Sequence, residues 1–127
     1  MATVGEIMST ELVTVEPSAS LTDTARVMAT GQAGSALVIE DGTLVGIFTE
    51  RDIMRALGLS SSADLARTSP VSKWMSREPE TIGPDTTVAE ALDRMLFRGF
   101  RHLPVMDGDA VVGIVSMRDL ARTIAER

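Results

Sequence analysis

The fold is decided by one stretch of sequence, Gly46-Ile47-Phe48-Thr49-Glu50-Arg51-Asp52, which returns 67 positions later as Gly113-Ile114-Val115-Ser116-Met117-Arg118-Asp119. At this offset the chain aligns with itself without a gap, residues 4–57 on residues 71–124, and about a quarter of the aligned positions are identical. A match that holds one register over nearly the whole chain indicates a duplicated structural unit.

Each repeat has the pattern of strand, helix, strand, strand and helix. A short extended piece, Val13–Val15 or Thr81–Ile82, ends near a proline, which closes a strand. Ser20-Leu21-Thr22-Asp23 and Thr87-Val88-Ala89-Glu90 follow, and a hydroxyl with an acid three residues later is typical of a helix start. The first helix of each repeat is therefore expected directly after these residues.

Two apolar runs and a last helix complete each repeat. The runs flank Asp41-Gly42 in the first repeat and Asp107-Gly108-Asp109 in the second, and Asp-Gly favours a tight hairpin turn. The expected strands are 36–39 with 44–48, and 103–106 with 111–115. The last helices begin near Thr49 and Ser116. Their spacing predicts inward-facing apolar residues, which are Ile53, Ala56 and Leu57 in the first repeat and Leu120 and Ile124 in the second.

One repeat is too small to cover both faces of its own sheet, so two repeats are expected to pack together. We assign residues 3–58 to repeat 1, residues 70–125 to repeat 2, and the serine-rich residues 59–69 to a linker. The expected fold class is therefore α/β (α+β), with two β-α-β-β-α repeats.

Composition limits the function. The chain has 127 residues, one histidine, no cysteine and no tyrosine, and no catalytic or dinucleotide-binding motif appears, so we expect neither an enzyme nor a metal site. A net charge of -6 disfavours nucleic-acid binding. The N-terminus has no basic leader and no apolar run reaches the roughly 18 residues of a membrane span, so we expect a cytoplasmic protein without membrane attachment.

The repeated stretch is the candidate site. A hydroxyl and free backbone amides at a helix start suit a phosphate, and the acid one turn later could accept hydrogen bonds from sugar hydroxyls. The same Thr-x-x-Asp pattern is also a capping box that needs no ligand. Arg51 and Arg118 lie at the same offset and are either ligand contacts or solvated helix residues.

At these residues the chain resembles a tandem pair of cystathionine-β-synthase (CBS) domains, whose repeats end with glycine, a hydrophobic residue, any residue and then Thr/Ser-x-x-Asp. The resemblance covers nearly the whole chain. It implies two repeats packed through their sheets about a pseudo-twofold axis, with clefts that in many pairs bind AMP, ADP, ATP or S-adenosylmethionine. It also implies a flat homodimer, in which ligand binding is read by a separate effector protein.

The resemblance assigns roles to particular residues. Asp52 and Asp119 would bind ribose hydroxyls, and Thr49 and Ser116 would contact ribose or phosphate. The cleft of Asp52 would be completed by Thr81, Ile82, Arg101, His102 and Pro104, and the cleft of Asp119 by Thr14 and the segment 34–37, which includes Ser35. Because that segment lacks the basic residues of the family, we expect the Asp52 cleft to bind better.

Three functions follow from this reading. The first is a regulatory, energy-sensing module that binds an adenine-containing ligand, with no cofactor required and an undetermined need for Mg²⁺. The second is a ligand-free structural or interaction dimer with the same fold. Nucleic-acid binding is third, because scarce aromatics and the acidic balance argue against stacking on bases.

Overall fold

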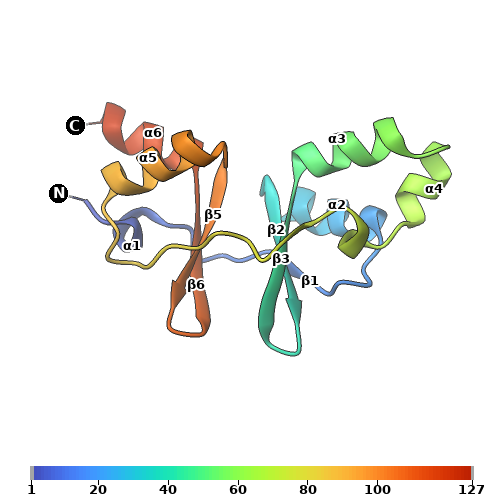
Figure 1. Ribbon diagram of the computed structural model, residues 1–127, viewed down its shortest axis with the longest axis horizontal. Coiled ribbons are helices and arrows are strands. Elements are labelled where there is room, and N and C mark those ends of the chain that lie inside the picture. Colours follow the sequence, from blue (N-terminus) through green and yellow to red (C-terminus); the bar gives the residue numbers. More distant parts are fainter. Residues whose placement is uncertain (1, 127) are drawn as a thin grey trace. The chain divides into compact units, whose positions relative to one another are not determined.

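The computed structural model describes residues 2–126 and divides into two compact units. Unit 1 is formed by the residues up to Leu12 together with those from Glu80 onward, and unit 2 by Val13–Pro79. Both are mixed α/β structures, which confirms the expected fold class. Figure 1 shows a long hairpin in each unit, with its turn pointing away from the helices of that unit.

Unit 2 is built around a four-stranded sheet. Its order is β1 (Thr14–Val15), β2 (Ser35–Glu40), β3 (Thr43–Thr49) and β4 (Ser76–Arg77); β1 and β2 are parallel and the other pairs are antiparallel. The unit also contains α2 (Leu21–Thr30), α3 (Glu50–Leu59), α4 (Ala63–Thr68) and the 3-10 helix η1 (Val71–Lys73). The helix α4 lies inside the expected linker, where the Ser62 hydroxyl accepts from the Leu65 amide at 3.1 Å.

Unit 1 has the same plan, but single bridges take the place of the two edge strands. Its elements are α1 (Val4–Ile7), α5 (Val88–Arg98), β5 (His102–Asp107), β6 (Ala110–Ser116) and α6 (Met117–Ala125). The strands β5 and β6 form an antiparallel pair, and isolated bridges extend it on both sides, Ile82 to Val105 in parallel and Ser9 to Ile114 in antiparallel. The expected extended piece at Thr81–Ile82 is thus reduced to one bridge.

Local signals explain most of these elements. Ser20 and Thr87 cap α2 and α5, since each hydroxyl accepts from the amide three residues later, at 3.0 and 3.1 Å. In the β2–β3 turn Asp41 and Gly42 both have positive φ, 51° and 79°, as a type I′ turn requires. The predicted helix starts and the hairpin are therefore confirmed.

The two leading segments are exchanged between the repeats. Residues 3–9 of repeat 1 pack on the strands and helices of repeat 2, and residues 71–77 of repeat 2 pack on those of repeat 1. The backbone of Ser9 exchanges two hydrogen bonds with Ile114, at 2.9 and 3.0 Å, and β4 pairs with β3 in the matching place. Each compact unit therefore contains chain from both sequence repeats.

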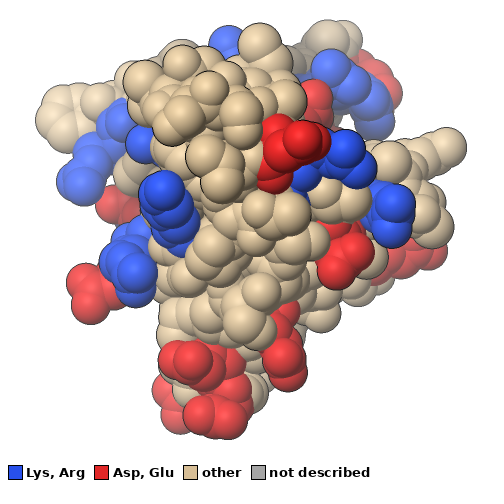
Figure 2. Space-filling view, turned by 90° about the vertical axis from the view of Figure 1, so that its right-hand side faces the viewer, with Lys and Arg blue, Asp and Glu red and all other residues tan. Residues whose placement is uncertain are grey.

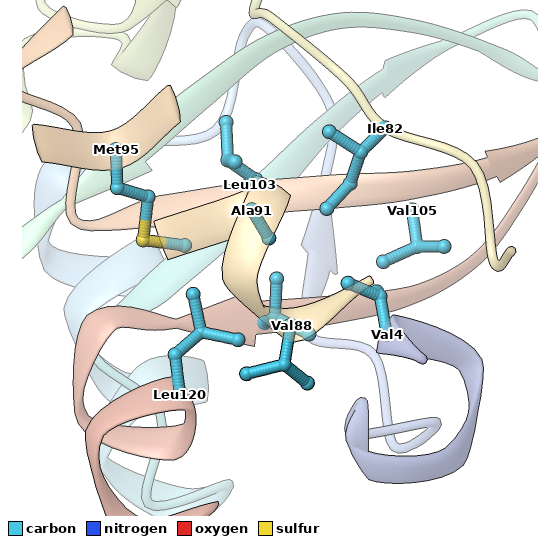
Figure 3. Close-up of a cluster of buried hydrophobic side chains, with 9 residues drawn as sticks. Val4, Ile82, Val88, Ala91, Met95, Leu103, Val105 and Leu120 are labelled. Atoms are coloured by element: carbon cyan, nitrogen blue, oxygen red, sulfur yellow. The ribbon is translucent and has the colours of Figure 1, made fainter. Parts of the chain in front are cut away.

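Each unit has a separate apolar core. Figure 3 shows that of unit 1, where Val4 of α1 meets side chains from α5, α6 and the strands. Its buried members are Val4, Ile82, Val88, Ala91, Met95, Leu103, Val105, Val115 and Leu120. The core of unit 2 holds the corresponding Leu21, Met28, Ala36, Val38, Phe48 and Val71, together with Ala56, Trp74 and Met75.

Two glycines leave room for the exchanged segments, because a side chain at either position would clash with them. A Cβ at Gly46 would lie 2.9 Å from Cγ of Met75 and 3.0 Å from the Ser76 carbonyl oxygen. At Gly113 a Cβ would lie 2.7 Å from Cγ of Met8, so both strands need glycine where a methionine crosses them.

The expectation about helix faces is wrong for two residues. Leu57 and Ile124 are 50% and 43% exposed, whereas Ala56 and Leu120 are fully buried. The inward prediction is therefore right for Ala56 and Leu120, and the inward face of each helix is narrower than the apolar spacing suggested. Among residues 2–126 no helix has both the length and the apolar character needed to cross a membrane.

Candidate functional site

The repeated stretch forms a strand-to-helix junction in both units. The strand β3 ends at Thr49 and α3 begins at the next residue, while β6 ends at Ser116 and α6 follows at once. Both hydroxyl residues have extended backbones, with φ of -125° and -111°, as N-cap positions require. The sequence therefore places a hydroxyl and the first helix amides at the end of a sheet strand in each unit.

In unit 1 the junction is a reciprocal capping box. The Ser116 hydroxyl accepts from the Asp119 amide at 3.1 Å, and Oδ2 of Asp119 accepts from the Ser116 amide at 3.0 Å. The capping box that Ser-x-x-Asp predicts is therefore formed. Asp119 is partly buried, and among residues 2–126 its second carboxylate oxygen accepts no hydrogen bond.

In unit 2 the corresponding carboxylate, that of Asp52, accepts more hydrogen bonds. Oδ2 of Asp52 accepts from the Thr49 amide at 2.9 Å and from its hydroxyl at 3.3 Å, and Oδ1 accepts from Nη1 of Arg55 at 2.9 Å. Asp52 is 5% exposed. Both of its oxygens thus have protein donors.

The beginning of the neighbouring strand lies beside each junction. Ser35 is opposite Thr49 in the β2–β3 ladder, and His102 is opposite Ser116 in the β5–β6 ladder. The carbonyl oxygen of Arg101 accepts from the Met117 amide at 2.8 Å. The side chain of Arg101 is exposed.

The remaining predicted residues lie on the edge pieces. In unit 1 the Ile82 amide donates to the Pro104 carbonyl at 3.1 Å, and both side chains are buried, while Thr81 is partly exposed. In unit 2 Thr14 is exposed and pairs with Leu37.

The units divide the predicted residues into two groups. Unit 1 holds Thr81, Ile82, Arg101, His102, Pro104, Ser116 and Asp119, and unit 2 holds Thr14, Ser35, Thr49 and Asp52. Arg101 and His102 are joined directly to the Ser116 junction. Their expected grouping with Asp52, and that of Thr14 with Asp119, spans two units and stays a prediction.

Sequence reasoning missed the surroundings of Arg55. The Cζ of Arg55 lies 5.9 Å from the centroid of the Trp74 ring, and Nζ of Lys73 lies 5.4 Å from it. The indole N–H is buried and has no hydrogen-bond partner within the described residues. Trp74 is the single tryptophan of the chain, which was the available signal.

Among the described residues potential metal ligands form no cluster, and basic side chains do not gather into one patch on the face that Figure 2 presents. Within residues 2–126 no three His, Cys, Asp or Glu side chains gather as metal ligands would. Figure 2 shows Lys and Arg interspersed with Asp and Glu on the face it presents, with acidic side chains gathered at the lower end. That face offers no continuous basic surface of the kind that nucleic acids require.

The family is established by comparison with known proteins. The sequence model of the CBS domain matches residues 4–59 and 71–126. The chain belongs to the CBS domain family. A relative from Acidianus ambivalens, the uncharacterized 17.7 kDa protein in the bps2 3′ region, is 41% identical over 129 residues, which cover 99% of this chain and 76% of that protein.

Two solved structures similar to this chain contain adenosine ligands. The CBS domain pair of protein MJ0100, in complex with 5′-methylthioadenosine and S-adenosyl-L-methionine, has a TM-score of 0.88 and 25% identity, and the match covers 99% of this chain and 98% of that one. CBSX2 in complex with AMP has a TM-score of 0.81 and 26% identity, with 99% and 98% covered.

Proposed function

We propose that this CBS pair is a regulatory, non-catalytic module that binds an adenine-containing ligand such as AMP, ADP, ATP or S-adenosylmethionine. The observation that carries the proposal is the doubled strand-to-helix junction, with a hydroxyl, first-turn amides and an aspartate in each unit. It is supported by the adenosine ligands of the two similar structures.

Each group has a definite chemical task in this proposal. The amides at the starts of α3 and α6 carry partial positive charge and suit a phosphate or another electron-rich group. Asp52 and Asp119 accept hydrogen bonds from ribose hydroxyls, and Thr49 and Ser116 contact ribose or phosphate. Arg101 gives a phosphate a planar, permanently charged partner. Thr81, Ile82, His102, Pro104, Thr14 and Ser35 complete the clefts.

The ligand would act by population shift. A ligand that binds one arrangement of the chain more tightly than another stabilises the first by its difference in affinity. A separate effector protein then reads the change, as an energy sensor in the cytoplasm would require. The proposal includes a homodimer.

Ligand-free association is the alternative, and two observations favour it. Both aspartates already satisfy a helix cap, so neither junction needs a ligand to be stable. Large apolar side chains are also exposed on the helices, among them Phe97 at 86% and Leu59 at 71%. A structural dimer that covers such residues would use the same fold without a bound nucleotide.

Binding measurements separate the two functions. We would titrate AMP, ATP, S-adenosylmethionine and NAD by calorimetry and follow thermal unfolding, with the wild type, Asp52→Ala and Asp119→Ala. At a ligand concentration of about 100 times Kd, one site stabilises the folded state by about 2.7 kcal/mol, so a rise in Tm should accompany the heat of binding. Each single variant should lose the site of the replaced aspartate and keep the other, and replacing both aspartates should abolish binding.

The opposite outcomes are equally definite. If binding persists unchanged when both aspartates are replaced, the proposed cradle is wrong. If none of the four compounds binds while sedimentation shows a stable dimer, ligand-free association is the better explanation. Mass spectrometry of any compound that co-purifies with the protein would identify a ligand outside this set.

A further inference from the structure

The two junctions have the same residue pattern but differ in one ion pair. An arginine follows the acid by three residues in both, Arg55 after Asp52 and Arg122 after Asp119. Nη1 of Arg55 lies 2.9 Å from Oδ1 of Asp52, and the side chains of these two residues are 51% and 7% exposed. Within residues 2–126, Arg122 forms no ion pair. Asp52 is therefore held by its own arginine, and Asp119 is not.

The cause lies outside the repeated motif. Arg55 rests over the ring of Trp74 with Cζ 5.9 Å from the centroid, and its Nη1 lies 3.5 Å from the Trp74 carbonyl oxygen. A tryptophan ring attracts a cation through its negative face. The residue at the equivalent position, 67 earlier, is Ile7, which has no such face. One aromatic residue thus explains why only Arg55 is fixed beside its acid.

Trp74 also connects the acid to the segment that leaves the unit. It directly follows η1 and precedes β4, after which the chain continues to Glu80 and unit 1. Trp74 is 8% exposed, and its indole N–H has no partner in the described chain, so packing and the neighbouring cations hold the ring in place. A group that displaces Arg55 therefore also changes the surroundings of Trp74.

We propose that Arg55 is a positioning residue that acts as a latch on Asp52, so that an adenosine ligand binds first at Asp119 and reaches Asp52 only by displacing Arg55 from the carboxylate and from Trp74. This inference rests on the proposed function. A ribose hydroxyl finds an oxygen of Asp119 without a protein donor, whereas at Asp52 it competes with a guanidinium. The order is the reverse of the one that the missing basic residues of segment 34–37 suggested.

The single tryptophan makes this order measurable. Because the chain has one Trp and no Tyr, its emission reports Trp74. We would titrate the full-length protein with AMP, and in parallel with S-adenosylmethionine, and record heat and emission. The heat of the first site should appear at lower ligand concentration than the emission change. Asp52→Ala should abolish the emission change, and Asp119→Ala should keep it.

The strength of the latch is measured with one site removed. In an Asp119→Ala background, Arg55→Gln should bind the same probe about two- to fivefold more tightly, the range expected for releasing a half-exposed ion pair. The matched control is Arg122→Gln in an Asp52→Ala background, which should leave affinity unchanged because Arg122 has no ion pair to release. Trp74→Phe keeps a packed ring but holds a cation less well, and should give a smaller gain.

The outcomes distinguish the latch from the function on which it rests. If neither probe binds the wild type, both proposals are wrong. If a probe binds but Arg55→Gln leaves its affinity the same or weakens it, with native circular dichroism retained, only the latch is wrong. An emission change that precedes or coincides with the first heat would also overturn the order of filling.

Discussion

Because the leading segments are exchanged, a mutation in the leading segment of one repeat should destabilise the hairpin of the other repeat. Val4 and Val71 occupy matching positions in the two repeats, and both are fully buried. Val4 belongs to the core that includes β5 and β6, and Val71 to the core that includes β2 and β3. Val4→Ala should therefore weaken residues 102–116, and Val71→Ala should weaken residues 35–49.

The magnitude follows from the atoms removed. Each substitution deletes two buried methyl-sized groups at about 0.8 kcal/mol each, and the cavity left behind raises the loss to about 2–3 kcal/mol. For amides that exchange through opening of their unit, this loss corresponds to roughly 30- to 160-fold faster hydrogen exchange. The two variants serve as controls for each other, since the chemical change is the same.

Native-state hydrogen exchange of both variants, read strand by strand, checks the prediction. The reasoning would be refuted if Val4→Ala accelerated exchange mainly in β2 and β3, which lie in its own sequence repeat. Equal acceleration in all four strands would show that the two units open together. The claim that each core stabilises its own unit independently would then be wrong.

Three further predictions concern stability and can be measured by urea unfolding. Gly46→Ala should destabilise the protein by about 1–3 kcal/mol because its Cβ would meet Met75. Gly58→Ala, in α3 where a Cβ meets no atom within 4 Å, should stabilise it by about 0.5–1 kcal/mol. A loss of stability at both positions would contradict this account. Gly42→Ala should cost about 1–2 kcal/mol, since φ there is 79°, and no loss would argue against the type I′ turn. Asp119→Ala should cost about 0.5–2 kcal/mol through the lost α6 cap, and an unchanged midpoint would show that the box contributes little.

Local chemistry made much of the fold predictable. Helix starts at Ser20 and Thr87 and the turn at Asp41-Gly42 each depend on residues within three positions, so the sequence specifies them directly. The junctions at Thr49 and Ser116 were located for the same reason. The helix α4 was missed because serine-rich segments favour loops as well as caps.

Long-range relations were not predictable in this way. Nothing in the side chain of Val4 indicates which of two similar cores it enters, because both cores accept a valine at that place. The ion pair of Asp52 likewise depends on Trp74, which lies 19 residues beyond Arg55 in the sequence. The pattern of acid and arginine is the same in both repeats, so it could not reveal that only one acid is paired.

The exchanged segments also bear on how such a chain could arise. A protein with a single repeat would have a leader that belongs on a copy of itself, so its folded form would be a swapped dimer whose stability depends on protein concentration. Covalent fusion of two copies turns that association into an intramolecular event, with an effective concentration on the order of millimolar for a short tether. In this chain the duplication therefore lets the exchanged segments find their partners by folding of one molecule.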